Sequence, residues 1–101
     1  MNTNATLDRR EVLKPIIPNP ENYLIITGLA GPARDAAALT DDGANTFTMA
    51  GCMGAAVSMG LGMALAASNR QVLVITGDGE LMMNLGSLAS VATLQPTNLS
   101  I

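Results

Sequence analysis

The chain has 101 residues, of which 49% are hydrophobic and 13% charged, a composition that fits one globular domain and not a disordered segment. The formal net charge is −3 and only 2% of the residues are aromatic, which argues against nucleic-acid binding, because a basic patch and stacking side chains are both lacking. With one Cys and no His, the chain cannot form an internal disulfide and is poorly equipped for a zinc site, and the lone Cys52 fits a cytoplasmic protein.

Apolar runs and helical spacing alternate along the sequence, and residues 1–13 lack the apolar stretch of a secretory signal. The predicted elements are, in chain order, a helix at 7–14, a strand at 23–27, a helix at 33–39, a strand at 46–49, a helix at 55–67, a strand at 72–76, a helix at 81–94 and a strand beginning at 99. Three prolines between residues 15 and 20 predict an irregular connector after the first helix.

This alternation is typical of a parallel α/β fold with right-handed crossovers. The strands are apolar without alternation, so we expect helices on both faces of the sheet. A membrane span from Met49 to Ala67 is the competing interpretation, since that stretch carries no charge and approaches the length of a bilayer span. Its four glycines lower its hydrophobicity, and a strand running into Gly77-Asp78-Gly79-Glu80 has no place in a bilayer, so we expect no membrane segment.

The turn Gly77-Asp78-Gly79-Glu80 follows the clearest strand and precedes a helix. Ligands of open α/β sheets bind beyond the carboxyl ends of the strands, where glycines allow close backbone approach and a helix N-terminus favours an anion. A carboxylate beside a phosphate needs a divalent cation between them, so Asp78 predicts Mg²⁺. A simple capped turn explains the motif equally well. A dinucleotide fingerprint is weaker, because Met82 stands where its third small residue should be.

A second glycine turn, 51–54, also lies between a predicted strand and a helix, and with the early turn at 28–32 it strengthens the case for a phosphate-bearing ligand. Lone Cys52 is expected to be buried and not a nucleophile, because the chain has no His partner for it. Four methionines are expected to fill the core: Met59, Met63, Met82 and Met83.

The segments GCMG, AAVSMGLGMALA and VLVITGDGELMMNLGSLASVA together resemble the diphosphate-binding domain of thiamine diphosphate enzymes. The chain is most similar to the group of sulfopyruvate decarboxylase beta subunits and phosphonopyruvate decarboxylases, which also share an early basic helix and a turn like GLAGPARDAAAL. The resemblance covers 7–101 and implies a parallel three-layer helix/sheet/helix fold. It also implies that residues 1–101 are the N-terminal part of a single binding domain, truncated at its C-terminus.

The resemblance implies a role for each matching residue. Asp78 would be a Mg²⁺ ligand, and Gly79 with Glu80 would line the diphosphate of thiamine diphosphate. The turn formed by Ala30 and Gly31 would make a second diphosphate contact. The Gly51 carbonyl would accept a hydrogen bond from the aminopyrimidine, while the N–H of Met53 would hold a ring nitrogen and its side chain would wedge the cofactor into a bent shape.

The family's second metal ligand should follow Ile101 by a few residues, and its catalytic glutamate comes from a pyrimidine-binding domain that is a separate alpha subunit in two-subunit members. We therefore expect no catalytic residue in this chain and a hetero-oligomer that decarboxylates a small 2-oxo acid. Alternatives left open are an acetolactate synthase-like carboligase and a non-catalytic flavodoxin-like binding module. Arg34 is either a contact for an anionic substrate group or an ordinary surface residue.

Overall fold

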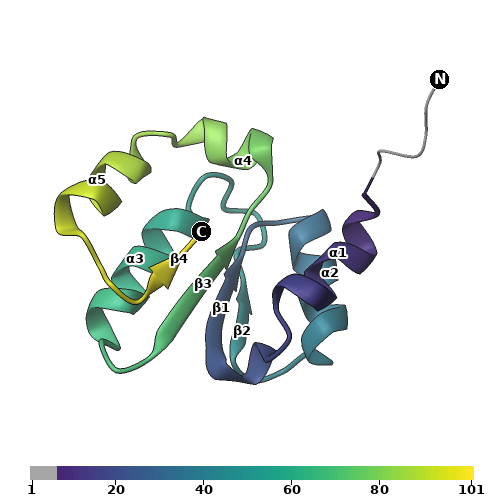
Figure 1. Cartoon of the computed structure of the whole chain (residues 1–101). Coiled ribbons are helices and arrows are strands. Elements are labelled where there is room, and N and C mark those ends of the chain that lie inside the picture. Colours follow the sequence, from purple (N-terminus) through teal and green to yellow (C-terminus); the bar gives the residue numbers. More distant parts are fainter. Residues whose placement is uncertain (1–6) are drawn as a thin grey trace.

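The computed structural model describes residues 7–101, which form one α/β unit (Figure 1). The elements are α1 (Arg9–Ile16), the 3-10 helix η1 (Pro20–Asn22), β1 (Tyr23–Thr27), α2 (Gly31–Thr40), β2 (Thr46–Thr48), α3 (Ala56–Ala66), β3 (Gln71–Ile75), α4 (Asp78–Met83), α5 (Ser87–Leu94) and β4 (Leu99–Ser100). Residues 1–6, which include the start of the segment expected to lack a secretory signal, lie outside the described residues.

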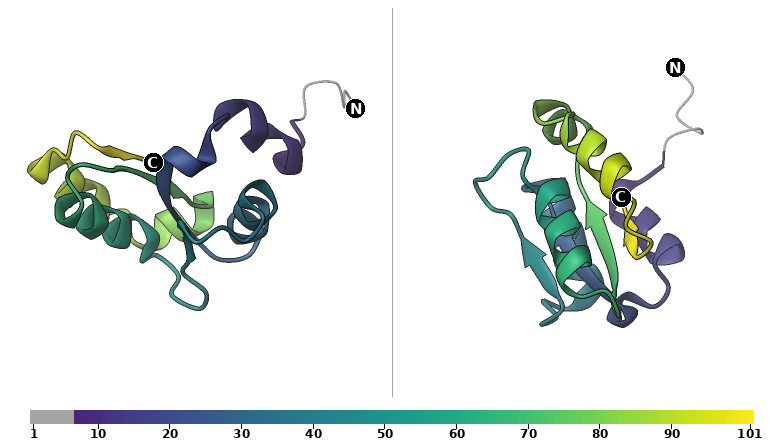
Figure 2. Two further views of the ribbon diagram at one scale, coloured as in Figure 1. Left: turned by 90° about the horizontal axis from the view of Figure 1, so that it is seen from below. Right: turned by 90° about the vertical axis from the view of Figure 1, so that its left-hand side faces the viewer.

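The four strands form one sheet in the order β2-β1-β3-β4, and every pair is parallel. Helix α2 packs on the sheet with α1 against it, and α3 packs on the opposite face with α5 beside it (Figures 1 and 2). The predicted parallel three-layer fold is therefore confirmed. The element order agrees with the predicted one up to β3, with boundaries that differ by a few residues, and departs from it in the region predicted as one helix over 81–94.

Helix α3 comes very close to β3 because its face toward the sheet is built from small residues. A Cβ placed on Gly60 would overlap Cγ2 of Val74, so only a glycine allows this approach. The core between the helix and the sheet includes Val57 of α3, Ile26 of β1 and Val72 of β3. Within residues 7–101 no helix is long and apolar enough to cross a membrane, and the alternative of a span from Met49 to Ala67 is wrong, since α3 has only 11 residues.

The expectation that helices cover both faces of β3 is only partly met. Val72 and Val74, which face α3, are buried, whereas Leu73 and Ile75 on the other face are half-buried. A hollow lined by these two residues and by parts of α1 lies along that face. The cause is that α1 contacts α2 more than it contacts the sheet.

The helix predicted over 81–94 is instead two helices, α4 and α5, separated at residues 84–86. Asn84 causes the break, because its carbonyl accepts hydrogen bonds from the N–H and the hydroxyl of Ser87 and starts a new turn. Two of the predicted core methionines, Met82 and Met83, are therefore on the surface, 68% and 62% exposed. Met59 is also partly exposed, while Met63 packs against the core.

Candidate thiamine diphosphate site

The connections that leave β1 and β3 run in opposite directions along the sheet. From β1 the chain passes through α2 to β2 at one edge, and from β3 it passes through α4 and α5 to β4 at the other. The carboxyl ends of two such neighbouring strands form the crevice where open α/β sheets bind ligands. The N–H of Gly28 donates to the carbonyl of Ile75 at 2.8 Å, which fixes the two strand ends side by side.

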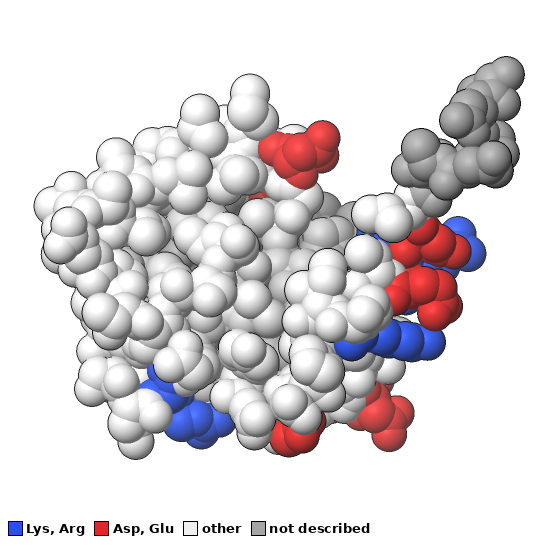
Figure 3. Space-filling view, in the orientation of Figure 1, with Lys and Arg blue, Asp and Glu red and all other residues white. Residues whose placement is uncertain are grey.

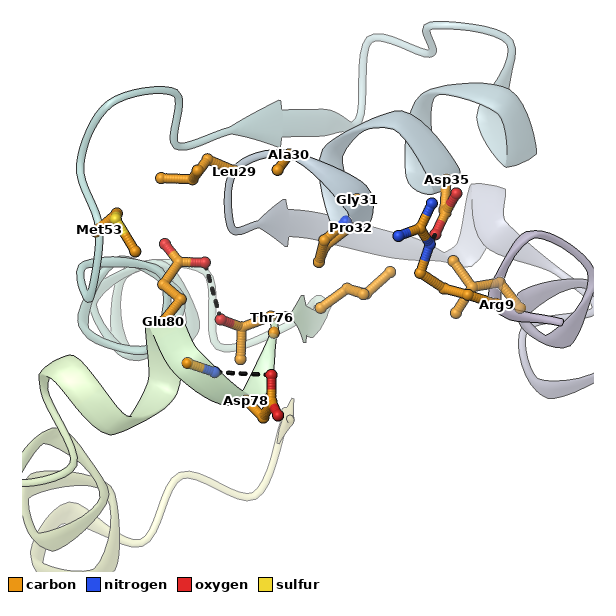
Figure 4. Close-up of a pocket in the computed structure, with 14 residues that line it drawn as sticks. Arg9, Leu29, Ala30, Gly31, Pro32, Asp35, Met53, Thr76, Asp78 and Glu80 are labelled. Carbon is orange, nitrogen blue, oxygen red and sulfur yellow. Dashed lines mark hydrogen bonds and ion pairs between the residues drawn. The ribbon is translucent and has the colours of Figure 1, made fainter. Parts of the chain in front are cut away.

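A cavity of about 430 Å³ occupies this crevice (Figure 4). Six of the seven predicted cofactor residues line it: Ala30, Gly31, Met53, Asp78, Gly79 and Glu80. The exception is Gly51, which lies in the same turn as Met53 but is not among the lining residues. The fold thus brings together three turns that are far apart along the sequence, at 28–32, 51–54 and 77–80.

The turn after β3 leaves room for a ligand. A Cβ on Gly77 or on Gly79 would meet nothing within 4 Å, so the backbone there faces open space. The Asp78 carboxylate is exposed, and its Oδ1 accepts a hydrogen bond of 2.8 Å from the N–H of Gly79. An exposed carboxylate beside an open glycine backbone suits a cation that is shared with a phosphate.

Within residues 7–101 no group of three or more His, Cys, Asp or Glu side chains could hold a metal ion. A closed protein cage for a metal is therefore lacking in this part of the chain. Mg²⁺ does not require one, because it binds through one or two carboxylates and completes its coordination with ligand phosphates and water. The donor set that Asp78 offers fits Mg²⁺ bound together with a diphosphate.

Glu80 lines the same cavity but differs sharply from Asp78. Its side chain is buried, and its two carboxylate oxygens accept hydrogen bonds from the Thr76 hydroxyl at 3.0 Å and from the N–H of Gly54 at 3.4 Å. In Figure 4 the Glu80 carboxylate points toward the loop that carries Met53, whereas the Asp78 carboxylate points away from it. Of these two residues, Asp78 is therefore the one whose carboxylate is exposed to solvent.

The turn 51–54 has the backbone geometry that glycine favours, with φ values of +83° at Gly51 and +88° at Gly54. It presents Met53, 50% exposed, at the wall of the cavity. The expectation that Cys52 is buried is wrong, because this turn leaves the thiol exposed. A half-exposed Met next to a cavity can shape itself to an apolar ring.

A cation that the sequence did not indicate also lines the cavity. Arg9 of α1 lies next to the start of α2, where its Nη1 would be 2.6 Å from a Cβ placed on Gly31. Its Nε is 2.7 Å from the carboxylate of Asp35, whose side chain is only 7% exposed. The other Arg considered, Arg34, is exposed and outside the cavity lining. No local spacing could have paired residues 9 and 35, because tertiary packing of α1 on α2 brings them together.

The sequence of the cavity-forming region also matches a known family. Residues 29–100 match the family described as "Thiamine pyrophosphate enzyme, C-terminal TPP binding domain". The chain belongs to this family. The resemblance inferred from the glycine turns is confirmed, and the family match favours a thiamine diphosphate site over a flavodoxin-like module.

Several known proteins are similar to this chain in sequence. The chain is 41% identical over 95 residues to a sulfopyruvate decarboxylase subunit beta from Methanothermobacter thermautotrophicus, covering 94% of this chain and 50% of that protein. It is 38% identical over 91 residues to a subunit of the same name from Methanocaldococcus jannaschii, covering 89% and 47%. A phosphonopyruvate decarboxylase from Streptomyces hygroscopicus is 51% identical over 59 residues, which are 58% of this chain and 14% of that protein. The chain thus spans about half the length of the beta subunits that it matches.

Proposed function

We propose that this chain binds Mg²⁺ and the diphosphate of thiamine diphosphate as the beta-type half of a 2-oxo acid decarboxylase. The observation that carries the proposal is the cavity at the β1/β3 crevice, which gathers six of the seven residues that the family resemblance assigns to the cofactor. The names of the similar proteins, sulfopyruvate and phosphonopyruvate decarboxylases, support decarboxylation as the reaction and an acidic 2-oxo acid as the substrate. We further propose that residues 1–101 are the N-terminal part of one binding domain.

The proposed division of roles follows the cavity wall. Asp78 would hold Mg²⁺, and the main chain of Ala30, Gly31, Gly79 and Glu80 would line the diphosphate. Arg9 at the same wall is paired with Asp35, so the positive charge that the diphosphate needs would come from Mg²⁺ at Asp78. When bound, thiamine diphosphate supplies the electron sink that lets a 2-oxo acid lose carbon dioxide.

The turn 51–54 would hold the other end of the cofactor. The main-chain carbonyl of Gly51 and the N–H of Met53 would bond the aminopyrimidine, and the Met53 side chain would support the bent shape. Gly51 lies outside the cavity lining, although it shares the turn with Met53. The exposure of Met53 supports its role as the wedge, since a buried side chain could not touch a ligand.

We propose a second subunit, of the alpha type, that supplies the catalytic glutamate. The term "subunit beta" in the names of similar proteins supports a hetero-oligomer. The surface supports it as well, because the face over α5 and β4 in Figure 3 is free of Lys, Arg, Asp and Glu side chains. Large apolar side chains are exposed on α4, α5 and the turn between them: Met82, Met83, Leu85 and Leu94. We place this complex in the cytoplasm, in keeping with a lone free Cys.

The test is carbon dioxide release from sulfopyruvate, phosphonopyruvate and pyruvate, measured with Mg²⁺ and thiamine diphosphate. We expect no turnover by the full-length beta-type protein alone, because general acid–base work requires a group within hydrogen-bond reach of the proton that it moves. Turnover is expected after addition of the alpha-type protein. Turnover without it would disprove the division of labour. If pyruvate gives acetolactate as well as carbon dioxide, the enzyme is a carboligase.

A further inference from the structure

The buried carboxylate of Glu80 fits into a space between two turns. A Cβ on Gly28 would overlap its Oε2, so the carboxylate occupies the space that any larger residue at position 28 would fill. Gly28 is itself buried at the end of β1. The Thr76 hydroxyl donates to Oε2 from the other side at 3.0 Å. The glycine at the end of β1 therefore leaves the space that the Glu80 side chain occupies.

The second oxygen of Glu80 holds the Met53 turn. Its Oε1 accepts the N–H of Gly54 at 3.4 Å, and Asn84, four residues further along the chain, donates from Nδ2 to the carbonyl of Gly54 at 3.0 Å. Both main-chain polar groups of Gly54 are thus held by side chains from α4 and its C-terminal cap. Gly54 is buried and packs closely, since its Cβ would lie 3.1 Å from Cβ of Asn84.

Without these contacts the turn has little to hold it. Its own hydrogen bonds are the N–H of Cys52 to the carbonyl of Met49 at 3.1 Å and the N–H of Ala55 to the carbonyl of Cys52 at 3.2 Å. The side chains of Cys52 and Met53 are exposed and add little packing. The contacts to Gly54 therefore decide where Met53 stands relative to the cavity.

We propose that Glu80 and Asn84 are positioning residues that clamp Gly54 and so aim Met53 at the ligand. This inference deepens the proposed function and rests on it for the identity of the ligand. A buried carboxylate that already accepts hydrogen bonds from Thr76 and Gly54 is unsuited to contact a diphosphate directly, because the two negative charges repel. The Glu80 side chain acts on the pyrimidine end of the cavity, through Gly54.

The geometry of the clamp is tested by a double-mutant cycle in the full-length protein, with thermal unfolding as the measurement. Gly28→Ala should lower the melting temperature strongly when Glu80 is present, because the added methyl displaces the carboxylate. In the Glu80→Ala background the same change should have little effect, since the space is then free. Equal effects in both backgrounds would overturn the proposed location of the side chain. This cycle needs no cofactor.

The positioning role is tested by calorimetric titration with two ligands in Mg²⁺, thiamine diphosphate and inorganic pyrophosphate. Glu80→Ala removes both carboxylate acceptors, so the N–H of Gly54 and the Thr76 hydroxyl lose their partner, and it should weaken thiamine diphosphate binding by about tenfold. Pyrophosphate affinity should stay within about twofold, because it does not reach Met53. Asn84→Ala should give the same pattern, and Glu21→Ala, at an exposed residue of η1, is the matched control.

Two results distinguish the proposals. A change in pyrophosphate affinity as large as the change in thiamine diphosphate affinity would show direct contact between the Glu80 side chain and the diphosphate, and would overturn the clamp. Absence of thiamine diphosphate binding by the unaltered protein would refute the proposed function alone. In that case amide hydrogen exchange at Gly54 still decides the clamp: its protection should fall in Glu80→Ala, and unchanged protection would overturn it.

Discussion

Two glycines of α3 allow the close packing of this helix to be measured against a control in the same helix. A Cβ at Gly60 would overlap Cγ2 of Val74 and lie 3.5 Å from Cδ1 of Leu99, whereas a Cβ at Gly62 would meet nothing within 4 Å. Val74 is β-branched, 2% exposed and part of the core, so it cannot swing away without disturbing its neighbours. Gly60→Ala and Gly62→Ala should therefore gain the same helix propensity and differ only in how the added methyl group packs.

The expected magnitudes follow from two opposing terms. Each Gly→Ala change in a helix stabilises by about 1 kcal/mol, because alanine has the better helix propensity. Overpacking at Gly60 should cost about 3 kcal/mol, since the side chain that must shift is stiff and buried. The net result is a destabilisation of about 2 kcal/mol for Gly60→Ala and a stabilisation of about 1 kcal/mol for Gly62→Ala.

Urea unfolding of both variants in the full-length protein, followed by circular dichroism, measures these changes. The difference between the two variants, about 3 kcal/mol, isolates packing because the propensity gain cancels. Val74→Ala should reduce the penalty of Gly60→Ala, since it removes the overlapped methyl group. Equal stabilities of the two glycine variants would refute the argument that Gly60 sets the distance between α3 and β3.

Further changes test the site and the loops around it. Asp78→Ala should weaken Mg²⁺-dependent thiamine diphosphate binding by at least about tenfold, because the diphosphate loses its bridging cation, and unchanged affinity by calorimetry would remove Asp78 from the site. Asn98→Ala should lower the free energy of unfolding by about 2 kcal/mol, because its Nδ2 donates to the carbonyls of Ala64, Ala67 and Arg70 at 2.9, 3.2 and 2.9 Å. Exposed Asn69→Ala is the control for that loss, and a similar effect there would contradict it.

The sequence by itself predicted the layers of the fold and most of the cavity wall. Apolar strands alternating with helices leave a parallel sheet as the simplest arrangement, and parallel connections place every turn after a strand at one sheet edge. For that reason the turns at 28–32, 51–54 and 77–80 could be assigned to one sheet edge before their distances were known. Local patterns and chain order suffice for that inference, whereas the roles of Ala30, Met53 and Asp78 within the turns came from the family resemblance.

Tertiary structure decided which side chain does what within the site. Spacing treats Asp78 and Glu80 alike, as two carboxylates of one turn, but packing leaves the first exposed and buries the second against Gly28 and Gly54. The same holds for Arg9, which reaches the cavity because α1 packs on α2. Burial depends on contacts between residues tens of positions apart, and the hydrophobic periodicity of the sequence does not reveal these contacts.

The break between α4 and α5 shows the same limit. Helical spacing continues through residues 81–94, and local propensity alone predicts a single helix. The amide of Asn84 instead bonds the carbonyl of Gly54, 30 residues earlier, and its own carbonyl starts the next turn. A polar side chain that finds a long-range partner overrides the helical pattern, and only the folded chain brings that partner within reach.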